Sequence, residues 1–130
     1  MKIVFLSLDE ILRLHQDLIN LYGGSHGMRN QDLLELALAQ PEAGFGDQYL
    51  CADIFEMAAA YLFHLVQNHP FHDGNKRIGA QSAIVFLGLN DIELKVECES
   101  KFEKLVMRVA SSQAAKPEIA EFFRQNSTKS

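Results

Sequence analysis

The chain has 130 residues, of which 48% are hydrophobic and 22% are charged. This length and balance suit one globular domain with its own core, and they exclude a disordered chain or one that depends on disulfides for stability. The net charge of -5 argues against general nucleic-acid binding, which needs a broad basic surface. Any anion site must therefore be a local cluster of basic residues.

The N-terminal apolar run and the two cysteines indicate the compartment. The run ends at Asp9, too early for a signal peptide, and no stretch approaches the roughly 18 apolar residues of a membrane helix. Cys51 and Cys98 have neither a CxxC spacing nor a histidine at zinc-ligand spacing, which favours two reduced thiols. We therefore expect a soluble cytoplasmic protein that contacts no membrane and no nucleic acid directly.

The first predicted elements are a short strand and a helix. Residues 3–6 are apolar and compatible with a strand. Ser7 and Glu10 have the spacing of a capping box, which predicts a helix that begins there and runs to about Leu21.

A second helix and a loop follow. Asn30 is expected to cap a helix over residues 31–39, and Pro41 ends it. Residues 42–50 contain two glycines and no helical period, which predicts a flexible loop or flap. This loop, with Tyr49, either covers a target peptide or is a plain surface loop.

Two central helices dominate the middle of the chain. Residues 53–67 and 78–89 are apolar on nearly every face, which is typical of helices buried on all sides. Residues 68–74 join them as a loop, and Asn90 is suited to end the second helix.

The C-terminal third is predicted to hold a strand and two further helices. Residues 92–96 suit a short strand, a capping box at residues 100–103 opens a helix to about Ala114, and Pro117 opens a last helix ending near Gln125. The sequence thus predicts an all-α fold: a single domain over residues 1–126 with about six helices and a minor β element. A frayed tail is expected at 127–130.

The loop and helix start at residues 69–77 read His-Pro-Phe-His-Asp-Gly-Asn-Lys-Arg. Lys76 and Arg77 fall in the first turn of a buried helix, where free amide groups and the helix dipole favour negative charge, so each costs some tenths of a kcal/mol, roughly, if uncompensated. A bound anion is the simplest compensation. The amides, the two cations and Gly74, which permits close approach, together make a phosphate cradle.

Three other residues of this loop have separate predicted roles. Asp73 offers an oxygen ligand beside the phosphate, a combination that suits Mg²⁺. His69, at the end of the preceding helix, can accept the proton of an attacking hydroxyl. Phe71 is expected to point into the core and pin the loop. These parts match phosphoryl or nucleotidyl transfer.

The same nine residues resemble the Fic motif, His-x-Phe-x-Asp/Glu-Gly-Asn-Gly/Lys-Arg, and match it at every specified position. With lysine at position 76, the motif is similar to that of the Doc ("death on curing") branch of the Fic/Doc family. Members of this branch are the toxins of toxin–antitoxin pairs. The resemblance covers roughly residues 5–125 and includes residues 22–24, 27–29, 33–38 and 86–90.

The resemblance implies a Fic/Doc-type helical domain and a role for each motif residue. His69 would be the catalytic base, and Asp73 would be the carboxylate linked to Mg²⁺. The nucleotide phosphates would be bound by Gly74, Asn75, Lys76 and Arg77.

The resemblance also implies a reaction and its partners. Doc toxins transfer phosphate from ATP to a threonine of elongation factor Tu, which stops translation. A separate small antitoxin would restrain the toxin, since the sequence lacks the Ser/Thr-x-x-x-Glu-Gly/Asn motif of self-inhibited Fic proteins.

Three alternatives remain open at this point. The nearest rival is a protein AMP-transferase, which has the same fold and attacks a different phosphate. Fic enzymes that transfer AMP have glycine in place of Lys76 and a second arginine where this chain has Ala80, and both differences argue against AMP transfer. His72 and Asp73 also spell the "HD" pair of metal phosphohydrolases, with His64 as the only nearby further ligand. A catalytically inert binding module is the last alternative.

The other ionisable residues are given no chemical role. His64 lies on a buried-looking helix and His72 occupies a variable position of the motif, so neither is expected to take part in the chemistry. His15 and His26 are expected to be solvated, and the glutamates at 97, 99 and 103 to form a solvated face.

Overall fold

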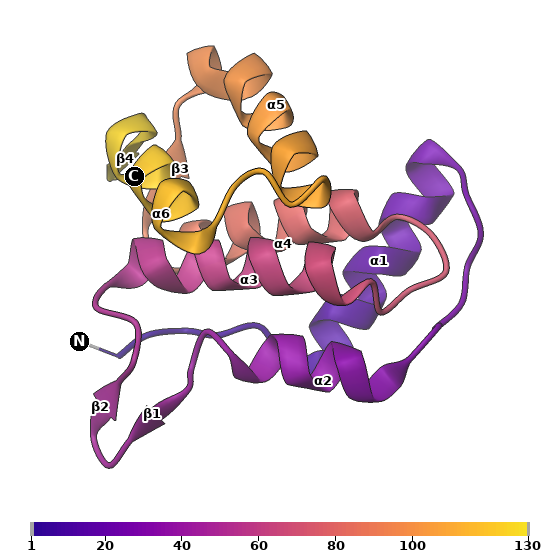
Figure 1. Ribbon diagram of the computed structural model, residues 1–130, viewed down its shortest axis with the longest axis horizontal. Helices are drawn as coiled ribbons and strands as arrows, with labels where there is room; N and C mark the ends of the chain where they lie inside the picture. The colour runs from indigo at the N-terminus through magenta and orange to yellow at the C-terminus, as the bar shows by residue number, and fades with distance from the viewer. Residues whose placement is uncertain (1, 130) are drawn as a thin grey trace.

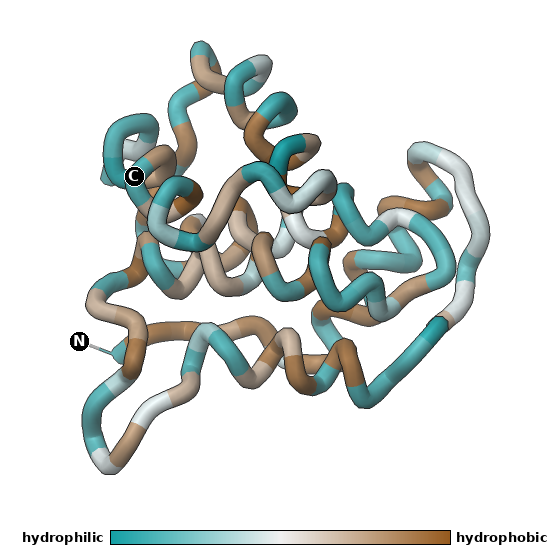
Figure 2. The backbone as a smooth tube through the Cα atoms, viewed as in Figure 1, coloured by the Kyte–Doolittle hydropathy of each residue, from teal (hydrophilic) through white to brown (hydrophobic). Residues whose placement is uncertain are grey.

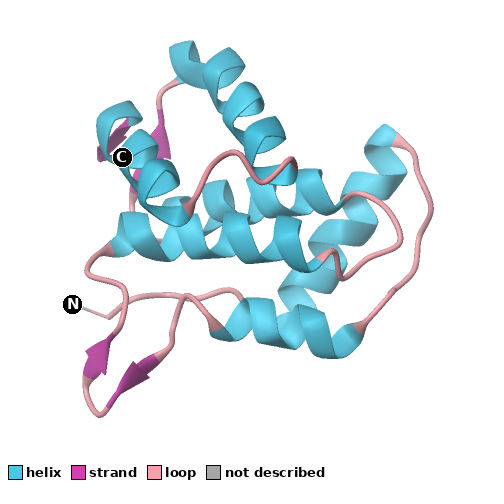
Figure 3. Cartoon of the chain, viewed as in Figure 1, coloured by secondary structure: helices cyan, strands magenta, loops and turns pink. Residues whose placement is uncertain are grey.

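The computed structural model describes residues 2–129. Within them lie six α-helices, one 3₁₀ turn and two small antiparallel sheets (Figures 1 and 3). In chain order these are α1 (Leu8–Tyr22), α2 (Gln31–Ala39), β1 (Gly44–Phe45), β2 (Gln48–Tyr49), α3 (Ile54–Asn68), α4 (Asn75–Leu89), β3 (Ile92–Leu94), η1 (Val96–Cys98), α5 (Glu99–Ala110), α6 (Lys116–Asn126) and β4 (Ser127–Lys129). The predicted all-α class with a minor β element is confirmed. Among the described residues, no helix has both the length and the hydropathy needed to span a bilayer.

The first three helices begin where side chains cap them. Ser7 and Glu10 form the predicted capping box of α1. Asn30 accepts the N–H of Leu33 at the start of α2, and Asp53 accepts the N–H of Glu56 at the start of α3. Each cap satisfies an amide that has no partner inside its own helix, so these helix starts are fixed locally.

The core is built around α3 and α4. Figure 1 shows α3 across the middle of the molecule, with α2 on one side and α6 on the other, and both pack against it. The α3 side chains Tyr61, Leu62 and Leu65 are fully buried, as are Ile78 and Phe86 of α4. By contrast, the outer loop between α1 and α2 is drawn white and teal in Figure 2, which marks its neutral to hydrophilic residues.

Residues 3–6 do not form the predicted strand. This extended segment is held by side chains instead: Val4 exchanges two 2.9 Å hydrogen bonds with the Asn90 carboxamide, and the Leu6 N–H donates to the Tyr61 hydroxyl at 2.9 Å. The prediction was wrong because an apolar run does not reveal whether a backbone partner lies alongside it.

The 42–50 segment, predicted to be a flexible loop, contains a β-hairpin. Gly44 pairs with Tyr49 and Phe45 with Gln48, and the chain turns at Gly46, which has a φ of 63°. Two-residue strands are too short to show an alternating pattern, so their sequence could not predict them.

The predicted frayed tail is also wrong for the residues described. Ser127–Lys129 forms β4, which pairs antiparallel with β3 so that Leu94 lies opposite Ser127 and Ile92 opposite Lys129. The polar sequence of the tail gives no strand signal, because its pairing depends on where the fold places β3. Ser130 lies outside the described residues.

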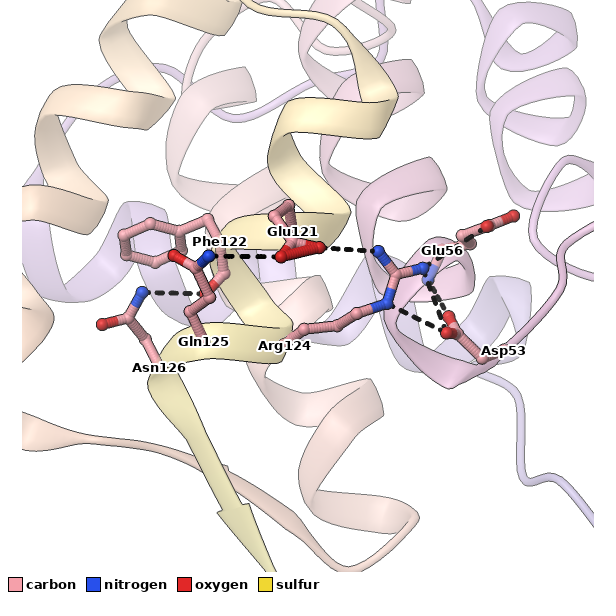
Figure 4. Close-up of polar contacts among 7 residues, drawn as sticks. All are labelled: Asp53, Glu56, Glu121, Phe122, Arg124, Gln125 and Asn126. Carbon is pink, nitrogen blue, oxygen red and sulfur yellow. Dashed lines mark hydrogen bonds and ion pairs between the residues drawn. The ribbon is translucent and has the colours of Figure 1, made fainter.

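An ion-pair network ties α6 to the start of α3 (Figure 4). The Arg124 guanidinium lies 3.0 Å from an Asp53 carboxylate oxygen, 3.4 Å from one of Glu56 and 3.2 Å from one of Glu121. The Arg124 side chain is 34% exposed, so each pair contributes at most about 1 kcal/mol. The network therefore adds little to the stability of the fold.

α3 and α4 lie in close contact at Gly79. A Cβ atom there would lie 2.7 Å from Val66 Cγ2 and 3.1 Å from the Leu62 carbonyl oxygen, whereas a Cβ on Gly88 of the same helix would meet nothing within 4 Å. We expect Gly79→Ala to lower the free energy of unfolding by about 1–3 kcal/mol through overpacking. Gly88→Ala should raise it by up to about 1 kcal/mol through helix propensity.

Urea unfolding followed by circular dichroism measures both variants against the parent. Equal stability of the two variants would contradict the close contact at Gly79.

Candidate functional site

Residues 69–77 form the turn between α3 and α4 and the first residues of α4. His69 ends α3 in the left-handed conformation, with φ 51° and ψ 54°, and Gly74 precedes α4 with φ 79°. Phe71, between them, is 2% exposed and points into the core, as predicted. The chain therefore bends sharply at both ends of the turn while its middle is anchored inside the protein.

His15 of α1 lies beneath the turn. Its ring stacks on Phe71 with centroids 3.7 Å apart and planes at 8°, and its Nε2 lies 2.7 Å from the Asp73 carbonyl oxygen. The prediction that His15 is solvated was wrong, because it lies four residues after Ile11 and shares the buried face of the helix. Burial lowers the pKa of His15 below its ordinary value, which favours the neutral ring.

The Asn75 side chain lies inside the turn and bonds the backbone of Phe71. Its carboxamide accepts the Phe71 N–H and donates to the Phe71 carbonyl oxygen, both at 3.0 Å, and the residue is 5% exposed. Asn75 was predicted to bind phosphate. Its side chain is instead occupied inside the protein, so only its backbone N–H is left to serve an anion.

The segment between α1 and α2 runs alongside the turn. The N–H groups of Arg29 and Asn30 both donate to the Pro70 carbonyl oxygen, at 2.8 and 2.9 Å, and the His72 N–H donates to the Gly27 carbonyl oxygen. This short backbone pairing holds the outer edge of the turn against the 23–30 segment.

Two further contacts explain the residue types of that segment. The Arg29 guanidinium donates to the carbonyl oxygens of Asn68 and His69, which would otherwise be unpaired at the end of α3. A Cβ on Gly24 would lie 2.7 Å from an Asp73 carboxylate oxygen. Sequence reasoning identified residues 22–24 and 27–29 only as part of a resemblance and gave Arg29 no role, because nothing local signals these contacts.

The start of α4 differs from every other helix start in the described residues. The other five α-helices have an acidic residue in the first turn, whereas α4 has none and lacks a side-chain cap. Lys76 and Arg77 are exposed there, beside amides without a helical acceptor. The two cations therefore do lie at the positive end of the α4 dipole, as predicted. A bound anion would offset this unfavourable placement of charge.

Asp73 presents its carboxylate at the same helix start. One oxygen accepts the Gly74 N–H at 2.9 Å and the other the Ser25 N–H at 3.1 Å. The described residues contain no cluster of three or more potential metal ligands, so an "HD"-type metal centre at His72 and Asp73 lacks its further ligands. A single exposed carboxylate beside two cations and the free amides of a helix start would fit Mg²⁺ if a phosphate were bound there, since Mg²⁺ takes the rest of its shell from phosphate oxygens and water.

The profile of the Fic/DOC family matches residues 5–87. The chain belongs to the Fic/Doc family. It is 33% identical to the "Protein kinase doc" of Escherichia phage P1 over 89 residues, which cover 68% of this chain and 70% of that protein. It is also 33% identical to the "Toxin Doc" of Mycolicibacterium smegmatis over 91 residues, which cover 69% and 70% of the two chains.

These comparisons confirm the resemblance to the Doc branch. The Fic/Doc profile ends within α4, earlier than the residues 5–125 over which the sequence suggested a resemblance. The matched part contains the whole motif together with the 23–30 segment and His15. The elements that hold the turn are therefore within the family match.

A groove adjoins the Fic/Doc motif between α1, α4 and α5. It is open to solvent and has a volume of about 530 Å³. Its lining includes Lys76 and Arg77, together with Tyr22, Ala80, Phe102 and Met107. The Arg77 guanidinium lies over the Tyr22 ring, 4.7 Å from its centroid, which holds this cation at the mouth of the groove.

The other histidines lie apart from this chemistry. His26 lies 3.0 Å from the Asn20 amide oxygen, and His64 lies 3.0 Å from the Lys116 ammonium at the start of α6. Burial, followed by the nearby Lys116 charge, lowers the pKa of His64 to about 4.

Asn75 provides a test of the closed turn. Asn75→Ala leaves the buried Phe71 N–H and carbonyl without partners, so we expect the free energy of unfolding to fall by about 1–3 kcal/mol. Asn20→Ala, at an exposed position on α1, should change it by less than about 0.5 kcal/mol. Thermal and urea unfolding measure the stability of both variants. An Asn75→Ala protein as stable as the parent would show that the Asn75–Phe71 hydrogen bonds do not stabilise the turn.

Proposed function

We propose that this protein transfers the γ-phosphate of ATP to a hydroxyl group of a target protein, with elongation factor Tu as the first target to test. The observation that carries the proposal is the start of α4, where Lys76, Arg77 and unpaired amides meet beside the Asp73 carboxylate. The similarity to a relative named "Protein kinase doc" supports phosphate as the transferred group.

Each residue of the turn has one task in this proposal. The amides at the start of α4 and the two cations bind the phosphate oxygens, with Arg77 able to bond two of them at once. Asp73 would hold Mg²⁺, which neutralises charge on the phosphate groups when bound. His69 accepts the proton of the target hydroxyl as its oxygen attacks the γ-phosphorus.

The bond changes balance within these groups. The new bond joins the target oxygen to the γ-phosphorus, and the bond from that phosphorus to the bridging oxygen breaks, so ADP leaves with the electron pair. The His69 ring is exposed, and the structure records no hydrogen bond from it to another described residue, so it is free to take the proton.

The biological role we propose is that of a toxin that blocks translation in the cytoplasm. The similarity to a protein named "Toxin Doc" supports this role and implies a separate small antitoxin as a partner. Phosphorylation adds charge of about -2 and three acceptor oxygens to its target, which disrupts an interface when the phosphate falls within it.

The product mass tests the reaction. After incubation of the protein with elongation factor Tu, ATP and Mg²⁺, we expect intact-mass spectrometry to show the gain of one phosphate on a threonine. A gain of AMP would replace the proposal with AMP transfer from the same site, and unmodified factor would rule out this target. His69→Ala should slow the transfer by about 100-fold or more, since a positioned general base contributes that much.

The phosphate cradle at the start of α4 is tested separately by measuring nucleotide binding. Arg77→Ala should raise the dissociation constant of ATP by about tenfold or more, because hydrogen bonds to charged groups contribute about 1.5–3 kcal/mol. Lys101→Ala removes the same charge from an exposed position on α5 and should leave the constant within about twofold. Calorimetry at fixed ionic strength compares the ATP dissociation constants of the two variants. Equal changes in both would indicate that net charge, rather than a specific phosphate site at Arg77, determines ATP binding.

A further inference from the structure

α1 reaches the motif turn through one polar side chain. His15 is 58 residues from Asp73 in sequence, yet its Nε2 lies 2.7 Å from the Asp73 carbonyl oxygen. The side chain is 4% exposed, and its other close partner is the Phe71 ring stacked upon it. In Figure 1, α1 passes behind the turn, consistent with this contact from beneath.

The contact determines which ring nitrogen carries hydrogen. A carbonyl oxygen only accepts hydrogen bonds, so Nε2 of His15 must be the donor. His15 therefore acts on the turn as a fixed N–H group directed at one backbone oxygen.

That hydrogen bond fixes a peptide plane. In a trans peptide the C=O and N–H groups point in opposite directions. Because His15 holds the Asp73 carbonyl towards the protein interior, the Gly74 N–H must point away from His15. This N–H donates to one carboxylate oxygen of Asp73 at 2.9 Å, and the Ser25 N–H donates to the other at 3.1 Å.

We propose that His15 is a positioning residue, which fixes the Asp73–Gly74 peptide plane and thereby the orientation of the Asp73 carboxylate at the start of α4. The proposal rests on the proposed function in one respect, the role of Asp73 as the carboxylate beside Mg²⁺. It adds a residue outside the motif to the machinery of the site. If His15 only filled space, a phenylalanine stacked on Phe71 would replace it without consequence.

Two substitutions separate the hydrogen bond from the stacking. His15→Phe keeps an aromatic ring on Phe71 but removes the donor. His15→Gln keeps an N–H donor at a similar reach but removes the ring. Ile11→Val shortens a buried neighbour on the same face of α1 and is the matched control for a general loss of packing.

The decisive measurement is Mn²⁺ binding in the presence of ADP, followed by electron paramagnetic resonance, because it does not depend on turnover. We expect His15→Phe to weaken Mn²⁺ binding about 10- to 100-fold, as loss of an outer partner does at other metal sites. ADP affinity without metal should stay within about twofold of the parent. His15→Gln should recover most of the loss, and Ile11→Val should bind Mn²⁺ like the parent.

A matching kinetic readout is the Mg²⁺ concentration at half-maximal phosphate transfer. It should rise in His15→Phe by a factor similar to the loss of Mn²⁺ affinity and return towards the parent value in His15→Gln. If His15→Phe does not fold, His15→Met gives a donor-free side chain that adapts to the same space.

The outcomes distinguish this proposal from the proposed function. Parent-like Mn²⁺ binding by the donor-free variants would overturn the role of His15, as would a parent protein that binds no Mn²⁺ with ADP. If the parent transfers no phosphate but the donor-free variants still weaken Mn²⁺ binding, the positioning role is supported and phosphate transfer alone fails.

Discussion

The close packing of α3 against α4 is the constraint on which the candidate site depends. The two helices approach so closely at Gly79 that a single added methyl group would meet Val66, and only the short segment from Asn68 to Asn75 joins them. A short turn brings the end of one helix and the start of the next to the same edge of the molecule (Figure 1). The proposed proton acceptor and the proposed anion site thus lie at adjacent helix ends.

The turn is held by buried Phe71 and by hydrogen bonds to its inward-facing backbone groups. Asn75 bonds both backbone groups of Phe71, His15 bonds the Asp73 carbonyl, and the 23–30 segment pairs with the outer edge. With the inner groups bonded, the cations and the free amides of α4 are left for a ligand. Preorganised groups of this kind need little rearrangement when charge develops, which is how phosphoryl-transfer sites act.

The starts of the first helices were predictable because their signals are local, whereas the predicted capping box at residues 100–103 was wrong, since α5 begins at Glu99 without a side-chain cap. Ser7, Asn30 and Asp53 each cap a helix three residues from the amide they bond. The β elements were not predictable from their own residues. Strands of two or three residues show no period, and β4 is polar, so only its position beside β3 makes it a strand.

The sequence by itself determined the all-α class, the nine-residue motif and the conflict between Lys76, Arg77 and the dipole of the helix they begin. All three depend on residues close together in the chain. Only the tertiary structure decided what holds the motif in place. His15 and Arg29 contact the turn across separations of 58 and 40 residues, and no local pattern encodes a partner so far along the chain. His15 therefore looked like a solvated residue in the sequence and became a buried support of the site once α1 was packed beneath the turn.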